Sequence, residues 1–202
     1  MRLFLFLLAA LCFALAPILS LAQSPELVSP LPPFAEKIPL NGIHDAGKVS
    51  DQLFRGAQPT LSSLPQLKTL GITTIVDLRL ESPHTRENER LRAESLGLRF
   101  VHIPVGGFSN PTSAQLAKFF SLFRETPPQK IFVHCEFGED RTGVFIASYR
   151  IAFQHWTAEQ ALAEMYAFGF RGFWHPAMIT FVRALPARLQ SDPALQAALS
   201  TQ

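Results

Sequence analysis

Apolar and polar positions along the chain follow two alternating periods, which predict strands and helices in turn. Short β-branched or aromatic runs at residues 73–78, 100–104 and 130–133 predict strands. Helical spacing, capping residues or charge predict helices over residues 60–70, 83–96, 112–123, 142–153 and 157–168. We therefore expect a single α/β domain with a mixed or parallel twisted sheet of about 4–5 strands, flanked by helices on both faces.

Charge is concentrated in the predicted helix at 83–96, which contains Arg86, Glu87, Glu89 and Arg90. A helix with so many charges is most simply a solvated helix. We interpret Asp77 and Arg79, on the strand before it, as structural residues.

The N-terminus has the pattern of a secretory signal peptide. Arg2 precedes the largely apolar residues 3–22, which end in the small-residue sequence Ser20-Leu21-Ala22. We predict a signal peptide at 1–22, a Pro-rich linker at 23–41, a folded domain at 42–187 and a C-terminal tail at 188–202. The protein is then exported to the periplasm or secreted; an uncleaved membrane anchor is the alternative.

The net charge and the cysteine content bear on possible partners and on disulfide bonds. Loss of the leader would remove Arg2, one of 18 basic residues set against 16 acidic ones, and leave a nearly neutral chain. Such a chain gives no reason to expect a nucleic acid or a membrane surface as partner, and we expect a monomer. Cys12 would leave with the leader, so Cys135 would be the one remaining cysteine, unavailable for any disulfide framework.

The candidate chemistry lies in residues 134–143, with the sequence HCEFGEDRTG between two apolar runs. This context predicts a strand, a short loop and the first turn of a helix. Five residues between Cys135 and Arg141 allow the backbone N–H groups to surround a tetrahedral anion. The predicted phosphate-binding residues are Glu136, Phe137, Gly138, Glu139, Asp140 and Arg141. Arg141 would add a bidentate contact, and Cys135, as a thiolate, would be the nucleophile.

The pattern HCxxGxxRTG resembles the signature of the cysteine-dependent phosphatases, in particular the atypical dual-specificity type. Residues 53–59 (LFRGAQP) and 71–79 (GITTIVDLR) resemble the opening strands of bacterial, fungal and plant members. The resemblance covers roughly residues 42–185. It implies a phosphatase domain that hydrolyses phosphorylated proteins or small phosphomonoesters through a phosphocysteine, with no metal and no organic cofactor.

Two residues beside the loop have predicted supporting roles. Thr142 is placed to hydrogen-bond the cysteine sulfur as it leaves phosphorus, and ordinary helix capping is its simpler role. His134 precedes the nucleophile on a strand, so its side chain should point to the other face and brace the loop. The remaining histidines show no metal-ligand spacing and are interpreted as structural or surface residues. For Trp174 and His175, core packing is preferred over a place at the pocket rim.

A general acid must protonate the leaving group of an ordinary phosphate ester. Most dual-specificity phosphatases use an aspartate on the loop after the strand that corresponds to 100–104, but here the loop 105–111 contains no carboxylate. The arrangement CxxxxDRT resembles the loops of myotubularin and Sac-type phosphatases, and we assign the acid to Asp140. Glu136 and Glu139 are rivals, and Asp140 has the alternative role of a structural brace.

Alternatives for the function come from three directions. An inositol phosphate or phosphoinositide phosphatase, which in the lipid case would bring a membrane partner, is compatible with the Asp140 resemblance. A phosphate-binding pseudoenzyme and a rhodanese-like sulfurtransferase are compatible with the cysteine loop. Three carboxylates in that loop would repel a polyanion, so we favour tyrosine or dual-specificity protein phosphatase activity.

Overall fold

The computed structural model describes residues 33–200 of the chain. The predicted signal peptide at 1–22 and the first part of the predicted linker, 23–32, therefore lie outside the described residues. Within 33–200, no helix is both long enough and apolar enough to cross a membrane.

One mixed sheet forms the centre of the fold, with the strand order β1-β2-β3-β6-β4-β5. The strands are β1 (Glu36–Lys37), β2 (Gly47–Lys48), β3 (Leu53–Gly56), β4 (Thr74–Arg79), β5 (Arg99–Val105) and β6 (Ile131–His134). Strands β3, β6, β4 and β5 run parallel, whereas β1 and β2 extend the β3 edge in antiparallel pairs. The α/β prediction is confirmed, and the sheet is wider than expected because β1 and β2 are too short to show alternation.

Seven α-helices and one 3₁₀ turn complete the described part of the chain. They are α1 (Leu64–Thr69), α2 (Pro83–Ser95), α3 (Ser113–Ser121), η1 (Leu122–Arg124), α4 (Asp140–Gln154), α5 (Ala158–Ala167), α6 (Pro176–Ser191) and α7 (Pro193–Leu199). Capping boxes start α3, through Thr112, and α5, through Thr157. The helices predicted from the sequence are present, with α1 shorter than expected, whereas α6 and α7 were not predicted.

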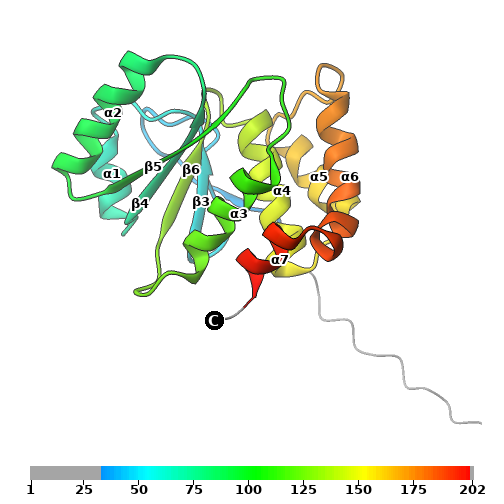
Figure 1. Cartoon of the computed structure of the whole chain (residues 1–202). Coiled ribbons are helices and arrows are strands. Elements are labelled where there is room, and N and C mark those ends of the chain that lie inside the picture. The colour runs from blue at the N-terminus through cyan, green and yellow to red at the C-terminus, as the bar shows by residue number, and fades with distance from the viewer. Residues whose placement is uncertain (1–32, 201–202) are drawn as a thin grey trace, which may run out of the picture. The chain divides into compact units, whose positions relative to one another are not determined.

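The helices form two layers on the sheet (Figure 1): α1 and α2 cover one face, and α3 to α7 cover the other. Alternation along the strands supplies both cores, because successive side chains point to opposite faces. Ile75 and Phe132 pack toward α1 and α2, while Val76 and Val133 belong to the larger core under α3 to α7.

The folded domain extends beyond the predicted boundaries of 42 and 187. Ala35 is buried, and its backbone N–H donates to Glu164 Oε1 at 2.6 Å. At the other end Leu195 of α7 is completely buried in the same core, and α7 packs against α3. The predicted linker and tail therefore each contribute to the core, because Ala35 and Leu195 both belong to the larger buried cluster.

The parallel strands determine where a site can form. Their carboxyl ends meet at one edge of the sheet, where ligands bind in folds of this kind. The loop after β4 carries Glu81, the loop after β5 carries Phe108, and the loop after β6 begins with Cys135. All three residues line one pocket at this edge.

Candidate active site

The loop between β6 and α4 has the predicted form of an anion cradle. Helix α4 begins at Asp140, with Glu139 as its N-cap residue. Within the described chain, the backbone N–H groups of residues 136–141 have no hydrogen-bond acceptor. Cys135, at the start of the loop, is only 3% exposed. A buried sulfur beside free N–H groups at a helix N-terminus is suited to a bound phosphate and to a nucleophile beneath it.

Gly138 and Arg55 fix the shape of this loop. Gly138 has φ of +80°, and a Cβ added there would lie 2.5 Å from the backbone N of Ala57. Arg55, completely buried on β3, donates from Nη2 to the Gly138 carbonyl at 2.7 Å and stacks 4.0 Å from the centre of the Phe168 ring. Burial lowers the pKa of Arg55 to about 10, so the side chain remains charged at neutral pH. No pattern in the sequence identified Arg55 as a residue of the site.

Arg141 is held at the pocket wall by two acceptors. Its Nη1 donates to the Val105 carbonyl at 3.2 Å and lies 2.7 Å from Glu81 Oε1. Burial alone would raise the pKa of Glu81, but backbone hydrogen bonds and Arg141 outweigh burial and lower this pKa. Glu81 was not identified from the sequence, because its loop follows β4, far from Arg141 along the chain.

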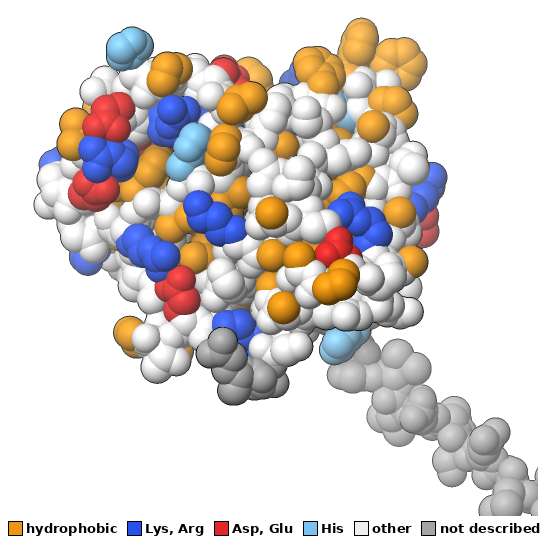
Figure 2. All heavy atoms as spheres, viewed as in Figure 1, with side chains coloured by type: hydrophobic (Ala, Val, Ile, Leu, Met, Phe, Trp, Pro, Cys, Tyr) orange, Lys and Arg blue, Asp and Glu red, His pale blue; other side chains and the backbone are white. Residues whose placement is uncertain are grey.

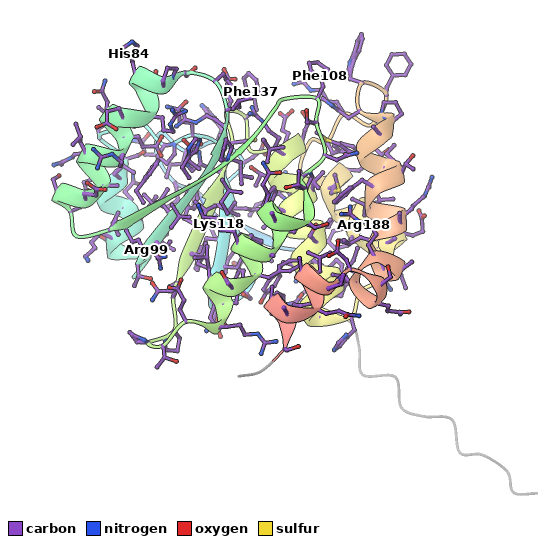
Figure 3. The ribbon with its side chains drawn as sticks, viewed as in Figure 1. His84, Arg99, Phe108, Lys118, Phe137 and Arg188 are labelled. Atoms are coloured by element: carbon purple, nitrogen blue, oxygen red, sulfur yellow. The ribbon has the colours of Figure 1, made fainter. Side chains whose placement is uncertain are left out.

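The pocket above Cys135 has a volume of about 440 Å³. Its lining residues are Glu81, Gly107, Phe108, Cys135, Glu136, Phe137, Glu139, Asp140, Arg141, Arg171, Trp174 and His175. Phe108, Phe137 and Trp174 are exposed aromatic side chains at its rim. Figure 3 labels Phe108 and Phe137 at the top of the view. Figure 2 shows hydrophobic side chains projecting at the upper right, where Figure 1 places the loop between α5 and α6.

Asp140 and Glu139 both face this pocket and both contact the loop between α5 and α6. Asp140 Oδ1 accepts a hydrogen bond from the backbone N–H of Arg171 at 3.1 Å, and its Oδ2 lies 3.3 Å from His175 Nε2. Glu139 lies 3.2 Å from Arg171 Nε. Burial raises the pKa of Glu139, an effect that Arg171 reduces and the carboxylates of Asp140 and Asp45 increase. Glu139 therefore remains the rival proton donor.

His134 braces the loop from behind through a buried charge network. Its Nδ1 contacts the Cys135 carbonyl at 3.1 Å, and its Nε2 lies 2.9 Å from Glu89 Oε1. Arg79 joins Glu89 to Asp77, with an Nη2 to Oε2 distance of 2.7 Å and an Nε to Oδ1 distance of 2.9 Å. Burial disfavours the charged ring of His134, but the carboxylate of Glu89 outweighs burial and raises its pKa.

This network corrects the expectation of a solvated helix at 83–96, because Glu89 is completely buried. The carboxylates of Asp77 and Glu89 and the ring of His134 are close enough together to surround a metal ion. The guanidinium of Arg79 already contacts both carboxylates, so the negative charge has a partner within the protein.

The predicted loop residues divide into two groups. Six of them line the pocket: Cys135, Glu136, Phe137, Glu139, Asp140 and Arg141. Gly138, His134 and Thr142 lie behind it. Thr142 Oγ1 is buried with no partner in the described chain, and α4 has no side-chain cap, so the capping role suggested for Thr142 is wrong.

The loop between α5 and α6 also contributes residues to the pocket. The sequence favoured core packing for Trp174 and His175, yet both line the pocket. Trp174 is 65% exposed, whereas His175 is 8% exposed and lies beside Asp140. Arg171 enters the site from the same loop. No pattern in the sequence could connect these residues to the cysteine loop, because only the packing of α5 and α6 on α4 brings them there.

Comparison with known proteins agrees with this geometry. A family model described as "DSP-PTPase phosphatase fused to NAD+ Kinase" matches residues 39–179. The chain belongs to this DSP-PTPase family. It is 28% identical over 123 residues to the dual specificity protein phosphatase TpbA of Pseudomonas aeruginosa strain UCBPP-PA14, which covers 61% of this chain and 54% of the relative. Dual specificity protein phosphatase 26 of Rattus norvegicus is 27% identical over 125 residues, covering 59% and 57%.

The fold of the chain is also similar to that of solved structures. P. aeruginosa TpbA superposes with a TM-score of 0.62 at 23% identity, covering 78% of this chain and 97% of that one. The catalytic core of the PP-IP phosphatase SIW14 from S. cerevisiae, in complex with citrate, gives 0.60 at 22% identity, covering 80% and 96%. The chain spans about half the length of the curated relatives that it matches.

Proposed function

We propose that this chain hydrolyses phosphomonoesters through a phosphocysteine intermediate on Cys135, acting as a tyrosine or dual-specificity protein phosphatase. The observation that carries the proposal is the buried Cys135 beneath a loop whose N–H groups at 136–141 have no acceptor among residues 33–200, beside the guanidinium of Arg141. Membership of the DSP-PTPase family supports a phosphatase over a sulfurtransferase.

The first step is attack of the Cys135 sulfur on phosphorus. The free N–H groups of the loop and the guanidinium of Arg141 surround the three outer oxygens, whose charge they stabilise in the transition state. Arg141 now contacts Glu81, so the phosphate must share or replace that partner. The S–P bond forms as the ester oxygen leaves, and water then cleaves the S–P bond to release phosphate.

The charged groups and the aromatic rings at the opening of the pocket favour some substrates over others. Four carboxylates line the pocket, from Glu81, Glu136, Glu139 and Asp140, against the two guanidinium groups of Arg141 and Arg171. A polyphosphorylated ligand would meet repulsion from these carboxylates. An aromatic ester can instead pack on the exposed rings at the rim. We therefore propose phosphotyrosine in a protein or peptide as the preferred substrate class, acting with no metal or organic cofactor.

A substrate panel tests this preference. Residues 23–202 would be assayed with phosphotyrosine peptides, phosphoserine peptides, phosphoinositides and inositol phosphates. We expect the highest kcat/KM with phosphotyrosine peptides. A higher value with an inositol phosphate or a phosphoinositide would overturn the substrate proposal and leave the phosphocysteine mechanism in place.

Asp140 is our candidate for the proton donor. The loop after β5 lacks a carboxylate, and Asp140 faces the pocket one residue before Arg141. Asp140→Asn should lower kcat by about 10²–10⁴ on phosphotyrosine, and much less on an activated aryl phosphate whose leaving group needs no proton. Glu139→Gln is the matched comparison, and we expect it to change KM more than kcat. A leaving-group dependence that follows Glu139 in place of Asp140 would reassign the acid.

A further inference from the structure

His175 is the most unusual side chain of the pocket that the proposed mechanism leaves unused. It is 8% exposed and forms the N-cap of α6. Its ring is stacked between Phe108, at 4.9 Å between ring centres, and Phe170, at 6.2 Å. This packing holds Nε2 at 3.3 Å from Asp140 Oδ2, at the wall of the pocket.

The donor role of Asp140 raises a problem that His175 can solve. A general acid must carry its proton before the leaving group departs, but a free aspartic acid is ionised at neutral pH. The backbone N–H of Arg171 already donates to Oδ1 and cannot supply a transferable proton. An imidazole beside Oδ2 can, because a ring nitrogen of histidine both binds and releases a proton.

The second ring nitrogen determines how tightly such a proton is held. Nδ1 of His175 is buried and has no hydrogen-bond partner in the described chain. An acceptor at Nδ1 would stabilise the imidazolium and make the ring a stronger base. His134 differs, since its Nδ1 contacts the Cys135 carbonyl. Within residues 33–200, the polar contact of the His175 ring is therefore the one between Nε2 and Asp140.

We propose that His175 is the positioning residue that holds, beside Asp140, the proton that Asp140 delivers to the leaving group, an inference that rests on the proposed function. In this pair one proton is shared between Nε2 of His175 and Oδ2 of Asp140. The ester oxygen leaves phosphorus with the bonding electron pair and takes that proton from Asp140, so that a carboxylate and a neutral imidazole remain. Attacking water returns a proton to the pair, and the S–P electron pair returns to Cys135 as a thiolate.

Other charged groups in the pocket also influence a pH profile. They are Glu81, Cys135, Glu136, Glu139, Arg141 and Arg171. Of these, Arg171 contacts the pair through its backbone N–H, which donates to Asp140, and its guanidinium is engaged by Glu139. A variant of His175 leaves all of them in place, so a change in the profile reports on the pair.

The test uses His175→Gln, which keeps a polar side chain but cannot bind a proton. We expect kcat on phosphotyrosine to fall about 10–100-fold near neutral pH, with a change below about threefold on an activated aryl phosphate. The fall of kcat toward high pH should begin at lower pH than in the wild type, and lowering the pH should restore part of the lost activity.

Two further variants separate proton supply from packing. His175→Phe keeps a ring between Phe108 and Phe170, and we expect the same leaving-group-dependent loss as for Gln. His84 is exposed, and Figure 3 labels it at the upper left, away from Phe108. His84→Gln should therefore behave as wild type. Equal slowing of both substrates at every pH, or wild-type kinetics in the Phe variant, would overturn the role of His175.

The outcome is distinguishable from failure of the proposed function. If Asp140→Asn shows leaving-group dependence and neither His175 variant does, then the phosphatase mechanism stands and the inference about His175 is wrong. If the wild-type protein hydrolyses no phosphomonoester, the proposed function and the role of His175 are both wrong.

Discussion

Replacement of Glu89 by Gln should destabilise the protein strongly, although Glu89 lies on a helix rich in surface charge. Its carboxylate is completely buried and pairs with two cations, Arg79 at 2.7 Å and His134 at 2.9 Å. Loss of one partner from a buried charge pair costs about 3–5 kcal/mol. Arg79 still pairs with Asp77 in this variant, so His134 is the cation that is left without a carboxylate partner. We therefore expect a loss at the lower end of this range, about 3 kcal/mol.

The pH dependence of that loss has a definite sign. Burial opposes charge on His134, but Glu89 raises the pKa of the folded state above that of a free histidine. The stabilisation by this pair is therefore fully present below the unfolded pKa, about 6.5, and is lost as the pH rises through the higher folded value. The difference between wild type and Glu89→Gln should be largest near about pH 6 and smaller near about pH 9.

Urea unfolding followed by tryptophan fluorescence measures both quantities. The matched control is Glu87→Gln, because Glu87 lies two residues before Glu89 on the same helix, forms a surface ion pair with Arg90, and has a side chain that is 53% exposed. We expect that control to change the free energy of unfolding by less than about 1 kcal/mol. A loss for Glu89→Gln no larger than for Glu87→Gln, or one that grows toward alkaline pH, would refute the reasoning.

Three further predictions concern the loop and the N-terminus. Arg141→Lys should lower kcat/KM by far more than about tenfold, because a single ammonium cannot replace the bidentate contact, and a smaller effect in steady-state kinetics would place the phosphate elsewhere. Gly138→Ala, at φ +80° with the added Cβ 2.5 Å from the backbone of Ala57, should lower the free energy of unfolding by about 1–3 kcal/mol and abolish phosphate binding; thermal unfolding and phosphate titration check this. For the N-terminus, we predict that mass spectrometry of the protein from its own cells shows a chain that begins at Gln23, and retention of Met1 in a membrane fraction would indicate the anchor.

The strand, the loop and the helix around Cys135 could be predicted from the sequence, because the residues that specify them are neighbours along the chain. Cys135 and Arg141 lie in one strand–loop–helix unit, and neighbours along the chain are sufficient to specify an anion cradle. The same holds for α3 and α5, since each begins with a capping box whose two members are three residues apart.

The residues that complete the site could not be predicted, because they arrive through tertiary packing. Arg55 comes from β3, Glu81 from the loop after β4 and His175 from the start of α6. Glu89 was misinterpreted because its charged neighbours conceal one buried position on the helix. The polar side chains that contact the loop thus depend on which elements lie next to it, which the local pattern does not specify.

The most direct test of the central claim is to trap the covalent intermediate. Wild-type protein would be quenched in acid during turnover of a phosphotyrosine peptide, and its peptides analysed by mass spectrometry beside Cys135→Ser. We predict one added phosphate on the peptide that contains Cys135, no phosphate and no turnover in Cys135→Ser, and continued binding of phosphate by that variant. Turnover by Cys135→Ser at a rate comparable to the wild type, or phosphate on another residue, would contradict the mechanism.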